Sequence, residues 1–140
     1  MKMRQLALDY LRRAEVRLRS AGHALSTGDY PDVVRFSQEC VELALKAALR
    51  AHGVEYPKEH DVGGILEDVA ERFPEWFREE IERIRGISSD LAAKRAASLY
   101  GLELAGKAPS DLFSQVDAQG ALHDASYVLQ VVRRLLQAEA

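Results

Sequence analysis

The sequence predicts an all-α fold, an antiparallel four-helix up-and-down bundle with one extra short helix. Apolar residues recur at spacings of three and four in four long segments, which is the period of a helix buried on one side. One of these segments is apolar around most of its circumference, and no segment alternates apolar and polar residues as a half-buried strand does. At 140 residues the chain is expected to form one domain, residues 1–140.

The first helix is expected to cover roughly 22 residues and to end near Ser26. Its apolar stripe repeats at spacings of four and three and comprises Ala7, Leu11, Ala14, Leu18, Ala21 and Leu25. Gly28 suits the left-handed position that follows many helices, and Asp29 or Tyr30 then caps the second helix, with Pro31 in its first turn. Because this connection is short, the two helices should be antiparallel neighbours.

The second helix, within residues 29–53, is expected to lie in the interior with the other helices packed around it. Apolar side chains cover most of its circumference. Its charged residues are spaced by four, three, four and four, so they form one narrow stripe: Arg35, Glu39, Glu42, Lys46 and Arg50. This stripe must face water, a partner chain or a ligand.

Prolines, glycines and capping residues predict where the next loop and the next two helices begin and end. Residues 53–60 are expected to form a loop, and Asp61 can cap a short third helix. Pro74 opens a fourth helix, and Gly101 ends it.

The C-terminal part of the chain contains one more long helix. Residues 102–115 should form a loop, because they contain a glycine and a proline and show no period. Ser114 and Asp117 form a capping-box pattern at the start of the last helix. Its apolar stripe comprises Ala118, Ala121, Ala125, Val128, Val132 and Leu135.

Composition and charge restrict the class of protein. The apolar fraction of 47% and charged fraction of 29% are typical of a globular protein, and the net charge of −3 argues against a general nucleic-acid coat. The single cysteine, Cys40, excludes a disulfide framework or a cysteine metal cluster. No apolar run approaches the roughly 18 residues of a membrane span, and no signal-peptide core follows Met1. We therefore expect a cytoplasmic protein with no membrane contact, no metal and no cofactor. The absence of Asn and the excess of arginine over lysine favour a thermophilic source.

Arg95 is the residue that points most directly to function. It occupies a place in the fourth helix where the period calls for an apolar side chain, in line with apolar residues between positions 77 and 91. A guanidinium cannot lose its charge, so at that place it needs a carboxylate, a bound anion or a wet groove. Two interpretations stay open: a structural pair with Glu39 or Glu42, or a phosphate or ribose contact in a cleft.

The polar side chains of the second helix and of the following loop have two interpretations as well. Glu42 and Lys46 are spaced to pair on a solvated face, or they bind a ligand together with the neighbouring amide of Gln38. His60 precedes a helix start, where it is a loop or capping residue or a ligand-binding side chain. No second His or Cys stands near it at metal spacing.

Four stretches together resemble the HEPN domain family. They are FSQECVELALKA at residues 36–47, HDV at 60–62 followed by IL at 65–66, RAASLYG at 95–101, and PSDLF at 109–113. The resemblance is to stand-alone archaeal and bacterial members, and it covers nearly the whole chain. It implies an all-helical bundle that often dimerises, with polar residues gathered in a cleft at the dimer interface.

The resemblance implies two activities as alternatives. Many members are metal-independent ribonucleases that use an Arg followed a few residues later by a His, whereas here Tyr100 stands at that distance from Arg95. A phenol with a reference pKa near 10 is a poor substitute for an imidazole near 6.5. Arg17 and His23 have the ribonuclease spacing, but they lie on the first helix, and we interpret that pair as chance. Other members, often encoded beside a minimal nucleotidyltransferase, act as toxin–antitoxin or nucleotide-binding partners of that enzyme.

The leading hypothesis is therefore a HEPN protein that binds a nucleotide or an RNA phosphate and partners a minimal nucleotidyltransferase in a toxin–antitoxin-like pair. The binding residues would be Gln38, Glu42, Lys46 and His60, beside Arg95. The first alternative is a metal-independent endoribonuclease with Arg95 and either Tyr100 or His60 as catalytic residues. The second alternative is a homodimerising scaffold without catalysis.

Overall fold

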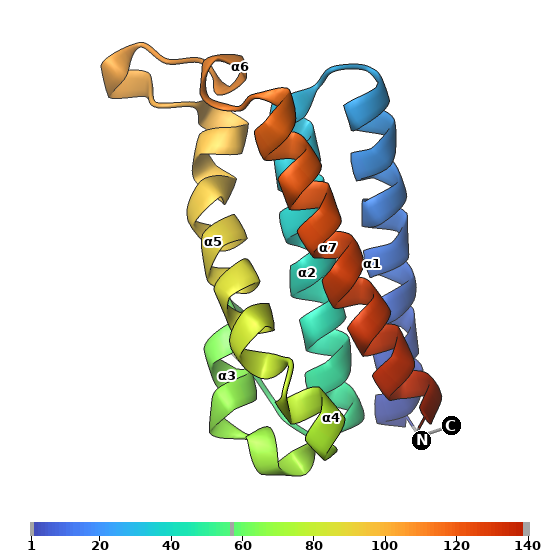
Figure 1. The fold of residues 1–140 in the computed structure, drawn as a ribbon. Helices are drawn as coiled ribbons and strands as arrows, with labels where there is room; N and C mark the ends of the chain where they lie inside the picture. The colour runs from blue at the N-terminus through green and yellow to red at the C-terminus, as the bar shows by residue number, and fades with distance from the viewer. Residues whose placement is uncertain (1, 57, 139–140) are drawn as a thin grey trace.

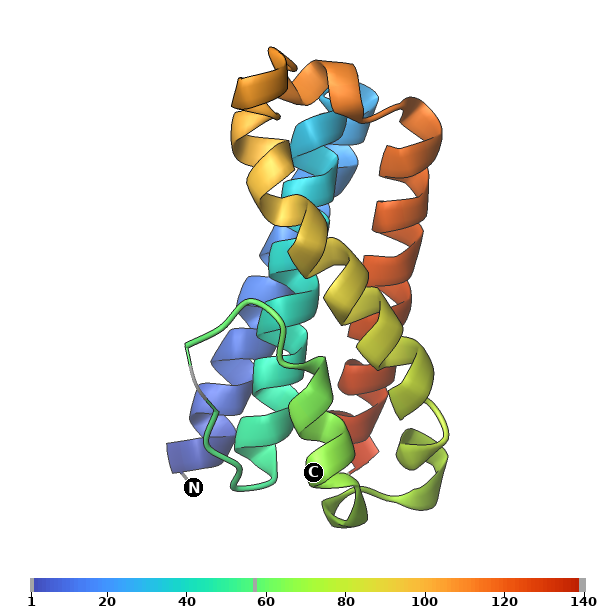
Figure 2. The same cartoon turned by 90° about the vertical axis from the view of Figure 1, so that its left-hand side faces the viewer.

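Four long helices form an up-and-down bundle (Figures 1 and 2) in the computed structural model, which describes residues 2–56 and 58–138. They are α1 (Lys2–Ser26), α2 (Tyr30–Ala51), α5 (Ile81–Tyr100) and α7 (Gln115–Ala138). The short elements are α3 (Gly63–Asp68), α4 (Glu75–Arg78), α6 (Pro109–Leu112) and the 3-10 turns η1 (Ala70–Arg72) and η2 (Glu103–Ala105). The predicted all-α bundle is confirmed. None of the helices described here is long and apolar enough to cross a bilayer.

Helix α2 is the central helix, as its apolar circumference predicts. It contacts each of the other three long helices, whereas α5 and α7 contact each other only slightly. The buried side chains of α2 span about 200° of its circumference at about 100° per residue. They run from Ala47 through Val34 to Leu49, and each of these three is at most 1% exposed. Because its neighbours bury this part of the circumference, little of α2 besides the charged stripe is left to carry polar chemistry.

The connection between α1 and α2 follows the prediction in its backbone and differs in its cap. Gly28 has a φ of +76°, the left-handed conformation expected after a helix. The carboxylate of Asp29 does not cap α2; it accepts a hydrogen bond from the Thr27 hydroxyl at 2.6 Å instead. Asp29 is the N-cap residue of α2, as predicted, but its side chain makes no capping hydrogen bond.

Asp61 ties α3 to α5. Its carboxylate accepts the backbone N–H of Gly63 at 3.1 Å and the hydroxyls of Ser88 and Ser89, each at 2.8 Å. Gly63 lies so close to α5 that an added Cβ would be 3.0 Å from the Cα of Arg85. A glycine at this position thus permits a closer approach of the two helices than any other residue would.

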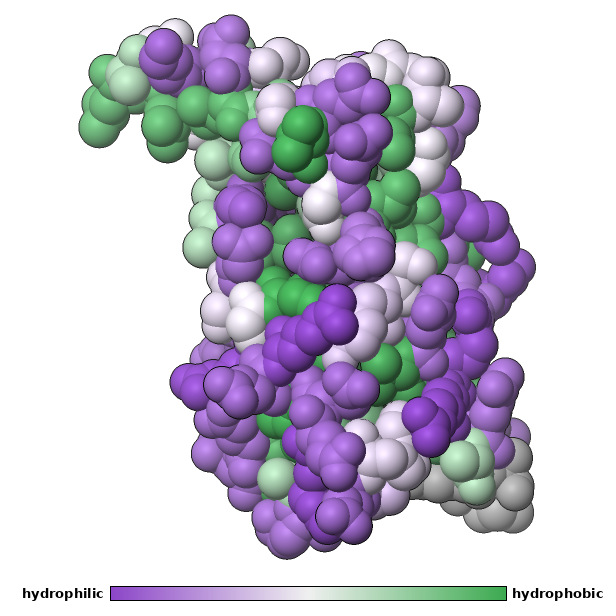
Figure 3. Space-filling view, viewed as in Figure 1, coloured by the Kyte–Doolittle hydropathy of each residue, from purple (hydrophilic) through white to green (hydrophobic). Residues whose placement is uncertain are grey.

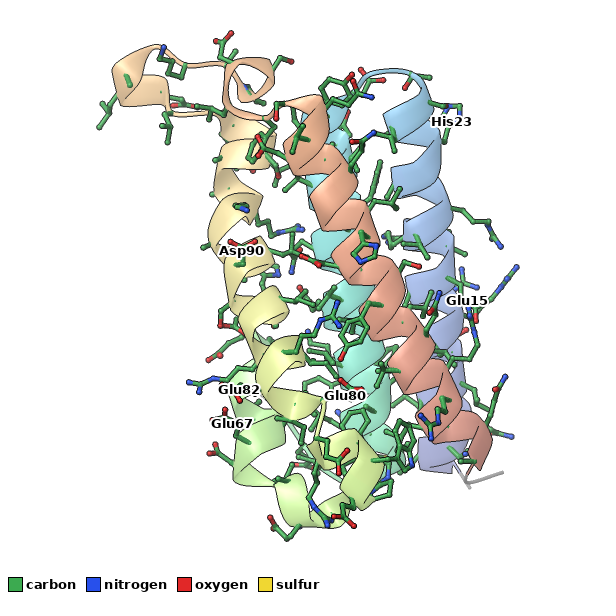
Figure 4. The ribbon with its side chains drawn as sticks, in the orientation of Figure 1. Glu15, His23, Glu67, Glu80, Glu82 and Asp90 are labelled. Carbon is green, nitrogen blue, oxygen red and sulfur yellow. The ribbon has the colours of Figure 1, made fainter. Side chains whose placement is uncertain are left out.

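The fourth helix predicted from Pro74 to Gly101 is interrupted at residues 79–80, so that α4 turns across the end of the bundle (Figure 1). This turn brings Phe77 beneath the core beside Phe73, with 4.7 Å between their ring centroids, and both rings are buried. At the break, the Glu80 carboxylate accepts a hydrogen bond from the Tyr127 hydroxyl of α7 (Figure 4). Burial of two aromatic rings explains why the chain gives up one continuous helix here.

Residues 102–115 are more ordered than the predicted loop, since they contain η2 and α6. Leu102 and Lys107 form an isolated antiparallel bridge, with N–H···O distances of 2.8 and 3.0 Å. The predicted capping box before α7 is confirmed: the backbone N–H of Ser114 donates to Asp117 at 2.9 Å, and the N–H of Asp117 donates to the Ser114 hydroxyl at 3.2 Å.

Candidate functional site

Arg95 points from α5 towards the charged stripe of α2, as its place in the helical period predicts. Its Nη1 donates to Oε1 of Gln38 at 2.9 Å and to Oε2 of Glu39 at 3.0 Å. The Arg95 side chain is 22% exposed, and Gln38 is 1% exposed. The guanidinium therefore lies in the wall of a groove, where one edge is held by the protein and some surface is left for solvent or a ligand.

Glu39 stands among three guanidinium groups. Arg17 of α1 donates through Nε to Oε1 at 3.1 Å, Arg95 donates to Oε2, and Nη1 of Arg35 lies 3.8 Å from Oε2. Arg35 also lies 3.9 Å from the exposed carboxylate of Asp32. Even with Asp32 counted, the three cations outnumber the two anions, so this part of the surface attracts an anion.

Glu42, one turn further along α2, is the centre of a second polar group. It accepts hydrogen bonds from Nε2 of Gln38 at 3.0 Å and from Nζ of Lys46 at 2.9 Å. Nδ1 of His60 lies 2.7 Å from its Oε1. Burial alone would raise the pKa of Glu42, but the hydrogen bonds from Gln38, Lys46 and His60 hold that pKa below its usual value. Because the carboxylate is ionised and can only accept, Nδ1 carries the proton of the His60 ring.

These two groups meet in a cleft of about 200 Å³. The side chains that line the cleft are Arg17, Glu39, Glu42, Leu43, His60 and Arg95. They come from α1, α2, α5 and the connection after α2, which runs back along α2 (Figure 2). The cleft thus combines fixed cations that can hold a phosphate with an oriented imidazole that can exchange a proton.

Three sequence-predicted site residues do not line the cleft: Gln38, Lys46 and Tyr100. Gln38 is buried, and its amide binds Arg95 and Glu42. The Nζ of Lys46 donates to Glu42 and lies 5.4 Å from the ring centroid of Tyr56. Tyr100 is 65% exposed at the end of α5, five residues from Arg95 and therefore roughly 140° around the helix axis. The predicted residues that do come together are Gln38, Glu42, His60 and Arg95.

Arg17 and Arg35 are site residues that the sequence-based interpretation did not include. The position of Arg17 could have been predicted from the antiparallel pairing of the first two helices. Arg17 and Glu39 are each eleven residues from Gly28, one before it and one after it, so they face each other across the turn. Arg35 belongs to the predicted charged stripe, but its contact with Glu39 depends on the side-chain rotamers of both residues, which the spacing along the helix does not determine.

The lowered pKa of Glu42 predicts a pH dependence of stability. Since the pKa in the folded chain lies below the ordinary value of 4.5, ionised Glu42 stabilises the fold above that pH, and this contribution is lost as the pH falls through the folded pKa. We expect Glu42→Gln to lose less stability than the wild type between pH 7 and about pH 3, which is below the reference pKa of Glu, measured by urea unfolding. The exposed Glu71→Gln is the control and should follow the wild type; equal losses for both variants would contradict the prediction.

The fold and the site define the class of protein: an all-helical bundle whose central helix borders a cleft lined by arginine, glutamate and histidine side chains. The sequence model of the HEPN domain matches residues 7–135, and the chain belongs to the HEPN domain family. The matched region includes every residue that lines the cleft.

Two similar proteins agree with this family. A protein of Methanocaldococcus jannaschii named "Putative toxin MJ1304" is 31% identical over an alignment of 134 residues that covers 91% of this chain and 86% of that protein. The crystal structure of ST0689, described as an archaeal HEPN homologue, has a TM-score of 0.70 and 24% identity, and the match covers 93% of this chain and 97% of that chain. At that identity the second match shows a shared fold.

Proposed function

We propose that this chain binds the phosphate groups of a nucleotide or an RNA in the Arg95 cleft, and that it does so as one member of a toxin–antitoxin-like pair. The observation that carries the proposal is the convergence of Arg17, Arg35 and Arg95 on the single carboxylate of Glu39. With Asp32 beside Arg35 counted, these three cations face two carboxylates, which leaves one positive charge available for a phosphate. The relative named as a toxin supports the biological setting.

Replacing Arg95 tests phosphate binding directly. We expect Arg95→Ala to weaken binding of ATP or of a short single-stranded RNA about tenfold in calorimetric titrations, because a charge-assisted hydrogen bond is lost. Arg13→Ala is the matched control, because Arg13 is an exposed arginine of α1 that pairs with Asp9 at 3.8 Å. The absence of binding to wild-type protein, or equal binding by Arg95→Ala, would count against the proposal.

Thermal melts of Arg95→Met separate a binding site from a scaffold. A chain whose only role is packing should tolerate this change or gain stability from it, because a partly buried ion pair is replaced by hydrocarbon. The proposed function requires a second effect, the loss of ligand binding in a variant that still melts cooperatively.

The proposed partner is a minimal nucleotidyltransferase, and a second copy of this chain would complete the assembly. Large apolar side chains are exposed at the end of α5 and beyond it: Leu99, Tyr100, Leu102, Leu104 and Val116. The projecting turn around η2 shows this apolar surface (Figure 3). A surface of this kind suits a protein interface.

Two measurements test these partners. Light scattering of the purified chain tests the homodimer, and copurification with a nucleotidyltransferase encoded by the neighbouring gene tests the second partner.

A metal-independent ribonuclease is the second candidate function, favoured by the finding that His60 and Arg95 line the same cleft. Nδ1 of His60 is bound to Glu42, so Nε2 would take the proton of a ribose 2′-hydroxyl as its oxygen attacks the phosphorus. A 2′,3′-cyclic phosphate forms as the bond from phosphorus to the 5′-oxygen breaks, and that oxygen takes up a proton from water, while Arg95 stabilises the negative charge on the phosphoryl oxygens. Incubating RNA with the protein in EDTA distinguishes this candidate: cleavage lost in both His60→Ala and Arg95→Ala supports it, and intact RNA overturns it.

A further inference from the structure

A second hollow lies beside the cleft, at the turn between α1 and α2. Its volume is about 560 Å³, compared with about 200 Å³ for the cleft. The lining residues with chemistry suited to a nucleotide are Arg19, His23, Arg35 and Phe36, and His23 projects near the end of α1 (Figure 4). We refer to this hollow as the hairpin pocket.

Arg35 connects the hairpin pocket to the cleft. Its Nη1 lies 3.8 Å from Oε2 of Glu39, which lines the cleft, and its guanidinium carbon lies 4.4 Å from the ring centroid of Phe36. In the part of the chain that the structure describes, the buried Nε of Arg35 has no acceptor within hydrogen-bond distance, and its ion-pair partner, Oδ1 of Asp32, lies 3.9 Å away. A buried donor without an acceptor costs free energy, so an acceptor atom brought by a ligand would be bound favourably here.

We propose that the hairpin pocket is a second nucleotide subsite, and that the ligand of the two hollows is a single-stranded polynucleotide. This inference rests on the proposed function, since it takes the Arg95 cleft as the first phosphate site. Each hollow has its own cations, Arg17 and Arg95 in the cleft and Arg19 and Arg35 in the pocket. On α1 the pocket extends to His23, about 9 Å along the axis from Arg17.

Because the two sets of arginines lie in separate hollows, they favour a polynucleotide over a nucleoside triphosphate as the ligand. The phosphates of a nucleoside triphosphate share bridging oxygens and gather at one cation set. Successive phosphates of a polynucleotide are separated by a sugar, so one can lie in each hollow. The half-buried ring of Phe36 offers an apolar face for a base, as aromatic side chains do in single-strand binding sites. Asp29 and Asp32 also line the pocket, and Oδ1 of Asp32 lies 3.9 Å from Nε of Arg35. These carboxylates can accept hydrogen bonds from the N–H groups of a base.

The test compares two ligands that differ in length. The probes are uridine monophosphate and a 5′-phosphorylated uridylate tetramer with 2′-O-methyl groups, which cannot be cleaved through its 2′-oxygen. We expect wild-type protein to bind the tetramer about tenfold more tightly than the monophosphate, because an additional base stacks and an additional phosphate is neutralised. Isothermal calorimetry measures both affinities.

Arg19→Ala separates the two hollows, because Arg19 is exposed and lines the pocket, not the cleft. We expect it to remove most of the additional tetramer affinity, to reduce the slope of log K against log[salt] by about 0.7, and to leave monophosphate binding unchanged. Arg13→Ala, at another exposed arginine of α1, is the control and should leave both affinities close to wild type.

The outcomes distinguish the subsite from the proposed function. Equal affinity of wild-type protein for both ligands, or equal tetramer affinity of Arg19→Ala and Arg13→Ala, overturns the subsite alone when binding still depends on Arg95. Failure of wild-type protein to bind either ligand overturns the proposed function and the subsite together.

Discussion

Gly101→Ala is expected to lower the free energy of unfolding by about 3 kcal/mol, because both the backbone and the space at this position admit only glycine. Gly101 ends α5 with φ +70° and ψ −153°, a conformation that residues with a Cβ rarely adopt. An added Cβ would lie 2.1 Å from the carbonyl oxygen of Lys107 and 2.9 Å from the carbonyl carbon of Ala108. That Lys107 oxygen already accepts the N–H of Leu102 at 2.8 Å, so it cannot move without breaking the bridge of the projecting turn.

Gly86→Ala is the matched control for this prediction, since it makes the same change in the middle of the same helix. Gly86 is exposed, and an added Cβ there meets nothing within 4 Å. We expect this variant to gain about 1 kcal/mol, because alanine is the better helix former. Urea unfolding measures both variants, and a Gly101→Ala protein as stable as the wild type would show that residues 101–107 rearrange without cost.

The long helices could be predicted from the sequence because each carries a continuous apolar stripe that a neighbour buries. The capping box at Ser114 and Asp117 and the end of α5 at Gly101 could also be predicted, because each depends on residue types at neighbouring positions. The break between α4 and α5 has no such local pattern. It depends on the burial of Phe73 and Phe77 beneath α2, which is a tertiary interaction between segments that the sequence leaves apart.

The candidate site was partly predictable for a similar reason. Arg95 could be found because a charged side chain in an apolar line must meet a polar group, and it meets Gln38 and Glu39. Tyr100 stands at the distance from Arg95 where the resemblance to HEPN ribonucleases expects a His, and a distance along one helix does not say which residues share a face. His60 joins Arg95 only because the connection after α2 runs back along the bundle, which no local pattern in residues 52–62 indicates.

Glu39→Gln is expected to strengthen phosphate binding in the cleft, in the opposite direction to Arg95→Ala. The side chain keeps its shape and loses the negative charge that opposes an incoming phosphate. At an effective dielectric constant of about 20, a unit charge about 5 Å from a phosphate contributes about 3 kcal/mol, and screening in an open cleft reduces this to roughly a ten- to hundredfold gain in affinity. Calorimetric titration with ATP and with short RNA measures the change.

Glu71→Gln removes the same charge from the exposed surface of η1, so it controls for the effect of net charge on binding. The stability of Glu39→Gln should fall at the same time, because Arg17 and Arg95 lose the carboxylate that holds them in place. A gain in affinity together with a loss of stability would mean that Glu39 occupies the place of a ligand's phosphate. A loss of stability with unchanged affinity would mean that the arginines serve only to hold α1 and α5 against α2.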